Sequence, residues 1–205
     1  TDSALAVVVL AAGEGTRMRS STAKVLHPLA GVPLIGHVLS TAAALHPQHV
    51  VAVVRHQRDA VVAAISELTE GVVIVDQDDV PGTGRAVELA LGALDGFDGD
   101  VVVVSGDVPL LDSVTLTELV SAHRAAGRAA SVLSALLDDA TGYGRIVRDG
   151  SGAFTKIVEH KDATDDERLI VEVNSGTYVF NAGLVRDALA KVTTANAQGE
   201  KYLTD

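Results

Sequence analysis

The feature that most constrains the fold is a regular alternation of short β-branched runs with longer amphipathic segments. We predict buried strands for ALAVVVL (4–10), HVVAVV (49–54), GVVIV (71–75) and DVVVVS (100–105). Helical periodicity predicts helices over 33–45, 58–68, 84–94 and 113–127. Continuous apolar strands that alternate with helices are typical of βαβ units, so we expect an α/β fold with a mostly parallel sheet and helices on both faces.

After about residue 130 the pattern becomes richer in strands and loops. We predict a strand over 129–137, a hairpin around Asp149–Gly150, an extended segment over 169–180 and a helix over 182–192. We interpret 1–205 as one domain, whose first half spans about 1–128 and whose strand-rich half, about 129–205, is an insertion that covers the substrate.

Composition narrows the class of protein. Hydrophobic residues make up 47% of the 205 residues and aromatic residues 3%, so the core must consist of Val, Leu, Ala and Ile. The net charge of −11 argues against nucleic acid or an anionic membrane as the main partner. The chain has no cysteine, which excludes disulfides and thiolate chemistry and suits a cytoplasmic enzyme. The apolar run 4–12 is too short to span a bilayer, and we expect no signal peptide.

The loop LAAGEGTRM follows the first predicted strand. Ligands of open α/β sheets bind beyond the carboxyl ends of the strands. Gly13 and Gly15 would let backbone N–H groups approach phosphate oxygens, and Arg17 and Lys24 add positive charge to the same loop. An ordinary strand-to-helix turn with two solvated cations is the alternative. A dinucleotide fingerprint fits poorly, because Met18 occupies its third glycine position.

Two further motifs follow the third and fourth predicted strands. Gln77 has an amide that donates and accepts, as reading a pyrimidine edge requires, and Gly82 and Thr83 open a helix whose N-terminus suits an anion or a sugar hydroxyl. Thr83 is alternatively a plain N-cap. Asp107, after the buried strand, is well placed to bind Mg²⁺, or alternatively serves a turn or a helix cap. The histidines lack zinc-site spacing, and no serine stands in G-x-S-x-G.

Taken in order, seven motifs resemble the N-terminal uridylyltransferase domain of the bacterial GlmU family. They are LAAGEGTRMRSSTAKVL, DQDDVPGTGRA, SGDVPLL, GYGRIV, IVEHKDAT, VNSGTYVF and NAQGEKYLTD, and they cover essentially the whole chain. That family uses Mg²⁺ to make UDP-N-acetylglucosamine and pyrophosphate from UTP and N-acetylglucosamine 1-phosphate, for cell-wall precursor synthesis in the cytoplasm. The resemblance implies a Rossmann-like, GT-A-like nucleotidyltransferase fold, with a nucleotide-binding first half and a sugar-binding second half.

The resemblance also implies roles for individual residues. Backbone groups of the first loop would contact the nucleotide, at Leu10, Ala11, Ala12 and Gly13. Arg17 and Lys24 would neutralise the triphosphate, and Asp107 would bind Mg²⁺. Other nucleotide contacts, with uracil, base or ribose, would come from Gln77, Gly82, Thr83, Ser105 and Gly106. The acetamido sugar would be held by Gly144, Glu159 and Asn174, and the same pocket would be lined by Tyr202 and Thr204.

Three departures from the family pattern stand out. Ala23 replaces a common proline before the loop lysine, which would loosen the placement of Lys24, and Val80 stands where some relatives have a glutamine near the base. A downstream asparagine that provides a second Mg²⁺ ligand, and the β-helix acetyltransferase domain on which trimer formation largely depends, lie outside this sequence. The alternatives are a nucleotidyltransferase for another sugar or polyol phosphate, and a nucleotide-sugar binding module without activity.

Overall fold

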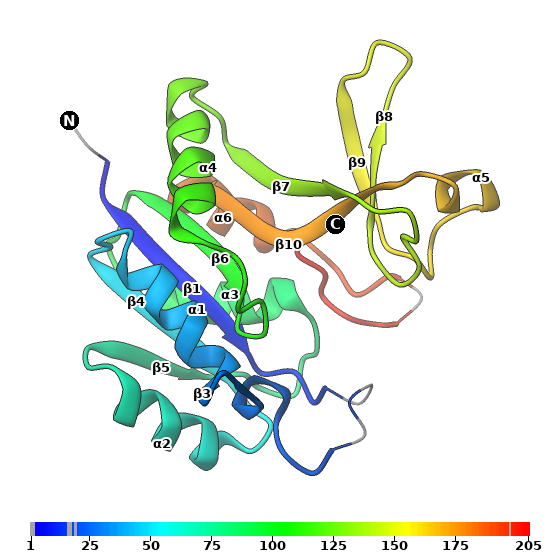
Figure 1. The fold of residues 1–205 in the computed structure, drawn as a ribbon. Coiled ribbons are helices and arrows are strands. Elements are labelled where there is room, and N and C mark those ends of the chain that lie inside the picture. The colour runs from blue at the N-terminus through cyan, green and yellow to red at the C-terminus, as the bar shows by residue number, and fades with distance from the viewer. Residues whose placement is uncertain (1–2, 16–17, 19, 197) are drawn as a thin grey trace.

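The computed structural model describes residues 3–15, 18, 20–196 and 198–205. Its frame is a set of four parallel strands, which Figure 1 shows in the order β5, β4, β1 and β6. Their bounds are β1 (Leu5–Ala11), β4 (His49–Val54), β5 (Val72–Asp76) and β6 (Asp100–Ser105). In the register of the sheet, Val7 lies between Val50 and Val102, so β1 is central. The predicted parallel sheet is confirmed.

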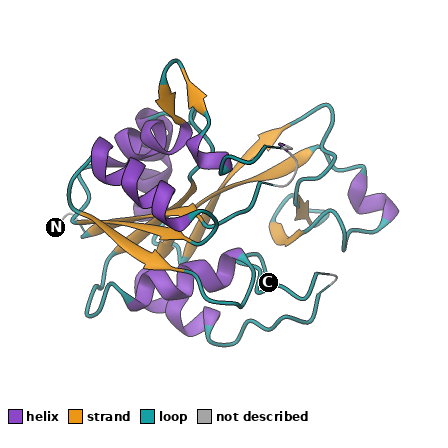
Figure 2. Ribbon diagram, turned by 90° about the horizontal axis from the view of Figure 1, so that it is seen from below, coloured by secondary structure: helices purple, strands orange, loops and turns teal. Residues whose placement is uncertain are grey.

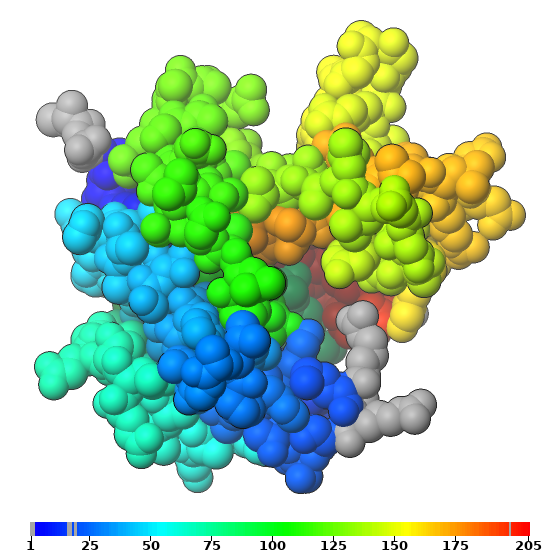
Figure 3. Space-filling model, in the orientation of Figure 1, coloured from blue at the N-terminus to red at the C-terminus, as the bar shows by residue number. Residues whose placement is uncertain are grey.

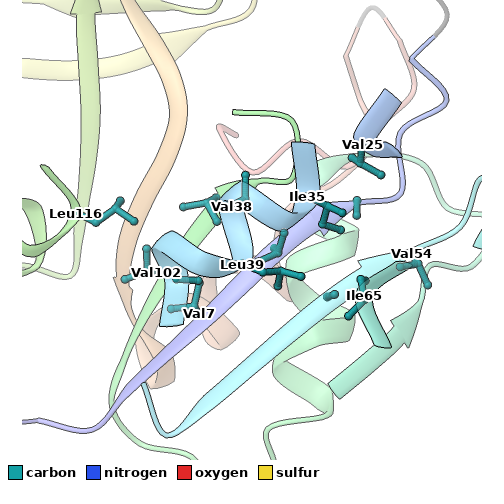
Figure 4. Close-up of a cluster of buried hydrophobic side chains, with 14 of the residues drawn as sticks. Val7, Val25, Ile35, Val38, Leu39, Val54, Ile65, Val102 and Leu116 are labelled. Carbon is teal, nitrogen blue, oxygen red and sulfur yellow. The ribbon is translucent and has the colours of Figure 1, made fainter. Parts of the chain in front are cut away.

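Helices cover both faces of this sheet (Figure 2). Since successive side chains of a strand point to opposite faces, β1 contributes to two cores. Val7 and Val9 pack with α1 (Leu34–Ala43), α2 (Arg58–Leu68) and α4 (Ser113–Ala125), as Figure 4 shows for part of this cluster. Ala6 and Val8 pack on the other face with α3 (Thr83–Gly92) and α6 (Ala182–Leu189). Burial on both faces explains why β1 has no polar residue.

The strand-rich half continues the same sheet. Strand β10 (Glu172–Asn181) pairs antiparallel with β6 and links the parallel strands to β7 (Ala130–Leu136), β8 (Arg145–Arg148) and β9 (Phe154–Val158). The described residues therefore contain one mixed eight-stranded sheet. The predicted hairpin is confirmed as β8 and β9, and its turn is held by Asp149, whose Oδ1 accepts from the backbone N of Ser151 at 2.8 Å.

Four short elements were not expected from the sequence, because each is too short to show a period. They are the 3-10 helix η2 (Lys24–Leu26), the strands β2 (Pro28–Leu29) and β3 (Val32–Pro33), and the helix α5 (Asp165–Arg168). Helix α5 did have a local signal, since Thr164 and Glu167 form a capping box at its start. Helix η2 matters most, because it begins at Lys24.

The carboxyl ends of β1, β5 and β6 point to the same edge of the sheet, where the motifs identified in the sequence follow them. Figure 3 shows a hollow on this side of the molecule, between the blue first loop and the yellow-green turn before β8, with the red C-terminal residues at its back. Among the described residues, no helix is both long and apolar enough to cross a bilayer.

Candidate active site

The ends of β1 and β6 are tied together by the backbone. The N–H of Gly106 donates to the carbonyl of Leu10 at 2.8 Å. A Cβ atom on Gly106 would lie 3.1 Å from that same oxygen, so glycine permits the approach. The starts of the two loops that follow these strands, at residues 12 and 106, are therefore held side by side at the carboxyl edge of the sheet.

The two glycines of the first loop serve different purposes. Among the described residues, a Cβ atom on Gly13 would meet nothing within 4 Å, so these residues leave the space in front of it open. Gly15 has φ +64°, and its Cβ would overlap the Cβ of Lys24. Gly15 is thus required by the protein itself, whereas the openness at Gly13 suits a ligand.

Lys24 and Asp107 form an ion pair at this edge. The Nζ of Lys24 lies on Oδ2 of Asp107, and the hydroxyl of Ser105 donates to Oδ1 at 2.6 Å. Burial of the Asp107 carboxyl opposes ionisation, but the bonds from Lys24 and Ser105 outweigh it and hold the pKa of Asp107 below its usual value. The carboxylate is therefore ionised at neutral pH and already attracts a cation.

A pocket of about 410 Å³ opens in front of this ion pair. Its lining comes from the first loop and from the end of β6: Leu10, Ala11, Gly13, Gly15, Met18, Lys24, Val25, Ser105 and Asp107. The structure thus brings Gly13, Lys24, Ser105 and Asp107 together, as the motifs predict. Arg17, predicted to grip the triphosphate, lies outside the described residues.

Gln77 follows β5 and holds the loop that leads to α3. Its Nε2 donates to the carbonyls of Val80 at 3.2 Å and of Gly82 at 3.1 Å. Both donor positions of the amide are therefore used within the loop, and no described residue donates to Oε1. The Gln77 amide thus presents an acceptor, rather than the combined donor and acceptor that its chemistry allows.

Gly82 and Thr83 lie against the C-terminal segment 200–204. Gly82 has φ +115°, and a Cβ there would overlap the backbone of Lys201. The N–H of Lys201 donates to Pro81 at 2.9 Å, and the N–H of Leu203 donates to Oγ1 of Thr83 at 3.1 Å. Gly82 is the N-cap of α3 and Thr83 is the first residue of the helix, so the alternative that Thr83 is a plain N-cap is wrong. Its position near the base or sugar stays a prediction.

The predicted sugar-binding residues gather around Glu159. A Cβ on Gly144 would lie 3.2 Å from Oε1 of Glu159, and Oγ1 of Thr204 donates to that oxygen at 3.1 Å. The N–H of Asn174 donates to the carbonyl of Gly144 at 2.9 Å. Burial raises the pKa of Glu159, and the neighbouring carboxylates add to this rise, while the Thr204 bond partly offsets it.

Two side chains in this half are occupied elsewhere. The Nδ2 of Asn174 donates to the hydroxyl of Tyr178 at 2.6 Å, and Oδ1 of Asn174 accepts from the N–H of Gly176 at 2.9 Å. Tyr202 is buried, and its hydroxyl accepts from Nε2 of Gln198 at 2.5 Å. The proximity of Asn174 to Gly144 therefore rests on its backbone, and Tyr202 supports the segment 200–204 from inside.

Several residues at the site were not singled out from the sequence. Arg145 is almost fully buried and donates to the carbonyls of Ile170 at 3.0 Å and Arg168 at 3.3 Å, and to that of Tyr143, which fixes the turn before Gly144. Lys201 donates to Oε2 of Glu88 at 3.0 Å. Gln57, far along the chain, holds the first loop. Most of these contacts join residues more than twenty positions apart, so the local sequence gives no signal for them.

The first loop, the Lys24–Asp107 pair and the mixed sheet define a domain with the nucleotidyltransferase fold. The chain belongs to the family described as the MobA-like NTP transferase domain, which matches residues 7–196. The predicted Rossmann-like fold agrees with solved structures. A UDP-glucose pyrophosphorylase complexed with UDP-glucose has a TM-score of 0.75 at 18% identity, covering 98% of this chain and 84% of that one. HddC from Yersinia pseudotuberculosis has a TM-score of 0.71 at 17% identity, with coverages of 97% and 83%.

Closer relatives carry the name "Bifunctional protein GlmU". The protein from Leifsonia xyli subsp. xyli is 62% identical over 100% of this chain and 42% of its own length. That from Clavibacter sepedonicus is 61% identical over 98% of this chain and 41% of its own length. The resemblance to GlmU is thus confirmed along the chain, which spans about two fifths of the length of these relatives.

Proposed function

We propose that this chain carries the uridylyltransferase activity of a GlmU-type protein, converting UTP and N-acetylglucosamine 1-phosphate into UDP-N-acetylglucosamine and pyrophosphate. The observation that supports this most directly is the placement of Lys24 and Asp107 side by side, at the ends of the first loop and β6, on an open pocket beside Gly13. High identity to proteins named bifunctional protein GlmU supports the choice of substrates.

In the proposed reaction, a phosphate oxygen of the sugar phosphate attacks the α-phosphorus of UTP. The bond from the α-phosphorus to the bridging oxygen breaks in line, and pyrophosphate leaves with that oxygen. No covalent bond to the protein is needed, so the protein acts by positioning and by neutralising charge. Lys24 would move from Asp107 to the triphosphate, and Arg17 would assist it from the same loop. Removing one such charged contact typically lowers turnover by about a hundredfold or more.

The residues at Asp107 fit a divalent cation. The site offers an ionised carboxylate that already holds the ammonium of Lys24, beside a pocket open to a triphosphate. Mg²⁺ commonly takes one or two carboxylates and completes its shell with phosphate oxygens and water. No group of three His, Asp or Glu side chains among the described residues forms a ready cage. Asp107 would hold Mg²⁺, which supplies charge neutralisation at the reacting phosphates when bound.

Substrate selection would come from the two sides of the hollow. Oε1 of Gln77 is an acceptor, which suits the N3–H of uracil and opposes the N3 lone pair of cytosine. Oxygen atoms of Glu159 would accept from sugar hydroxyls, and the tight space beside Gly144 would place them. Asn174 would keep the Gly144 backbone in position through its own N–H.

For a full-length GlmU-type protein we propose a second activity, the acetylation of glucosamine 1-phosphate. A separate β-helix domain would carry it and would also form a homotrimer. The product would serve cell-wall precursor synthesis in the cytoplasm. We propose neither nucleic acid nor membrane as a partner, since the chain is strongly acidic.

The test is pyrophosphate release with UTP, Mg²⁺ and N-acetylglucosamine 1-phosphate. Parallel reactions replace the sugar phosphate with glucose 1-phosphate, or UTP with CTP. We expect rapid release with the proposed pair and slow release with either substitution. Faster release with glucose 1-phosphate or with CTP would assign the site to another nucleotidyl transfer. Binding of UDP-N-acetylglucosamine without release from any pair would indicate a binding module.

A further inference from the structure

Gln57 has an unusual backbone conformation at the carboxyl edge of the sheet. It lies between β4 and α2 with φ 48° and ψ 40°, in the left-handed region. A residue with a Cβ adopts this conformation at a cost in free energy, so other interactions must stabilise it. Its carbonyl accepts from Val61 at 3.1 Å, which starts α2, but this bond does not involve the side chain.

The side-chain amide of Gln57 spans the first loop. Its Oε1 accepts from the backbone N–H of Ala23 at 3.1 Å, and its Nε2 donates to the carbonyl of Ser21. Ala23 is 1% exposed, so its N–H needs a protein partner. Gln57 thus joins the start of α2 to a loop more than thirty residues earlier in the chain.

This connection acts next to Lys24. Ala23 immediately precedes Lys24 and is the N-cap of η2, and the next residue, Val25, is buried in the core. On the other side of the lysine backbone, Gly15 leaves room for its Cβ. The backbone of Lys24 is therefore held by Gln57 through Ala23, by the core through Val25, and by the close packing of Gly15.

The geometry points to Gln57 as a positioning residue for Lys24 in nucleotide binding and transfer, an inference that rests on the proposed function. A proline at position 23 has no N–H and would preclude the bond to Oε1. Ala23 has φ −53°, within the range of proline, so in this chain the bond from Gln57 restrains a conformation that a proline ring would restrain by itself. Gln57 would therefore restrain Lys24 in place of the proline that this chain lacks at position 23.

The main test is Gln57→Gly. Glycine adopts the left-handed backbone without cost, which offsets the stability lost with the two hydrogen bonds, so the melting temperature should change little. We expect kcat/KM for UTP to fall roughly tenfold, as two lost hydrogen bonds would allow, with the KM for the sugar phosphate nearly unchanged. His46 has φ 50° at the opposite end of β4, so His46→Gly is the matched control and should leave the kinetics unchanged.

A second variant tests the mechanism of positioning. In Gln57→Gly/Ala23→Pro, the ring restrains residue 23 and removes the N–H that had lost its partner, so most of the kcat/KM for UTP should return. Gln57→Asn keeps an amide but is one methylene too short for both bonds, and it should behave like Gln57→Gly. Full activity in Gln57→Gly, or a fall that matches a loss of melting temperature, would overturn the inference.

Hydrogen exchange separates this inference from the proposed function. We expect faster amide exchange in the peptide containing Ala23 and Lys24 when Gln57 is replaced by Gly, with α2 unchanged. Unchanged exchange in that peptide would overturn the role of Gln57, whatever the kinetics. The unsubstituted protein could release no pyrophosphate while the exchange difference is still present. That result would contradict the proposed function but would support the role of Gln57 in restraining the loop.

Discussion

Oγ1 of Thr204 donates a hydrogen bond of 3.1 Å to Oε1 of Glu159, which joins the C-terminal segment 200–204 to the predicted sugar-binding residues. One residue earlier, Leu203 donates its N–H to Thr83 at the start of α3. The segment 200–204 therefore contacts both the predicted nucleotide side and the predicted sugar side of the hollow.

Replacing Thr204 by Val keeps the shape of the side chain and removes its hydroxyl. We expect the KM for N-acetylglucosamine 1-phosphate to rise about three- to tenfold, because Glu159 loses a donor that fixes its orientation. The KM for UTP should change less than about twofold. Steady-state kinetics with each substrate varied would measure this, with Thr117→Val on α4 as the control. Equal increases in both KM values would mean that the segment, rather than Glu159, is disturbed.

Glu159→Gln should change how the stability of the protein depends on pH. The pKa of Glu159 is raised in the folded protein, so its contribution to stability is fully present below its ordinary pKa and is lost as pH rises through the folded value. The Gln variant has no such loss. Urea unfolding at several pH values should show the variant gaining stability relative to the unsubstituted protein as pH rises above the ordinary pKa of a glutamate, about 4. Parallel pH profiles would contradict the raised pKa.

The same carboxylate is predicted to bind the sugar. Glu159→Gln and Glu159→Ala should therefore weaken sugar phosphate binding while UTP binding stays nearly intact. Titration calorimetry with each ligand separately would show this difference. A matched drop in UTP affinity would count against a role confined to the sugar.

The two glycines of the first loop should respond differently to alanine. The Cβ of Gly13→Ala meets no atom of the described residues, so the free energy of unfolding should change by less than about 0.5 kcal/mol. UTP affinity should fall because the Cβ occupies the ligand space. Gly15→Ala is strained at φ +64° and overlaps Lys24, so it should lose about 1–2 kcal/mol or more. Chemical denaturation and UTP titration of both variants test this contrast. Unchanged UTP binding in Gly13→Ala would remove the glycine from the nucleotide site.

Asp107→Ala should lower turnover far more than stability. The ion pair with Lys24 is partly exposed on the lysine side, so the free energy of unfolding should fall by about 1 kcal/mol or less. Turnover should fall at least about a hundredfold, since the variant loses the proposed metal ligand. Arg17→Ala should follow the same pattern. Comparable losses of turnover and stability would reduce both residues to structural roles.

The ion pair also predicts an acid dependence of stability. The pKa of Asp107 is lowered in the folded protein, so its contribution is present above its ordinary pKa and is lost as pH falls through the lowered value. The stability difference between the unsubstituted protein and Asp107→Ala should therefore shrink below about pH 4. Thermal unfolding between pH 3 and pH 7 would measure it.

The sequence by itself determined the layered sheet and the edge of the sheet at which the candidate site lies. Runs such as 101–104 are apolar at successive positions, a pattern typical of a strand buried on both faces. The loops after β1 and β6 meet because parallel strands bring their carboxyl ends to one edge. Gly13, Lys24 and Asp107 were predicted to lie together for this reason, and they do.

Only the tertiary structure decided which groups remain available to a ligand. The amide nitrogen of Gln77 donates to two carbonyls of its own loop. The space beside Gly82 is occupied by the backbone of Lys201, and the N–H of Ala23 donates to the side chain of Gln57. The last two pairings join segments far apart in the sequence, so no local pattern predicts them, and the Gln77 pairing depends on how the loop from Val80 to Gly82 folds back. Hydrogen-bonding capacity can be read from a residue type, but its use depends on which backbone atoms the fold brings within about 3 Å.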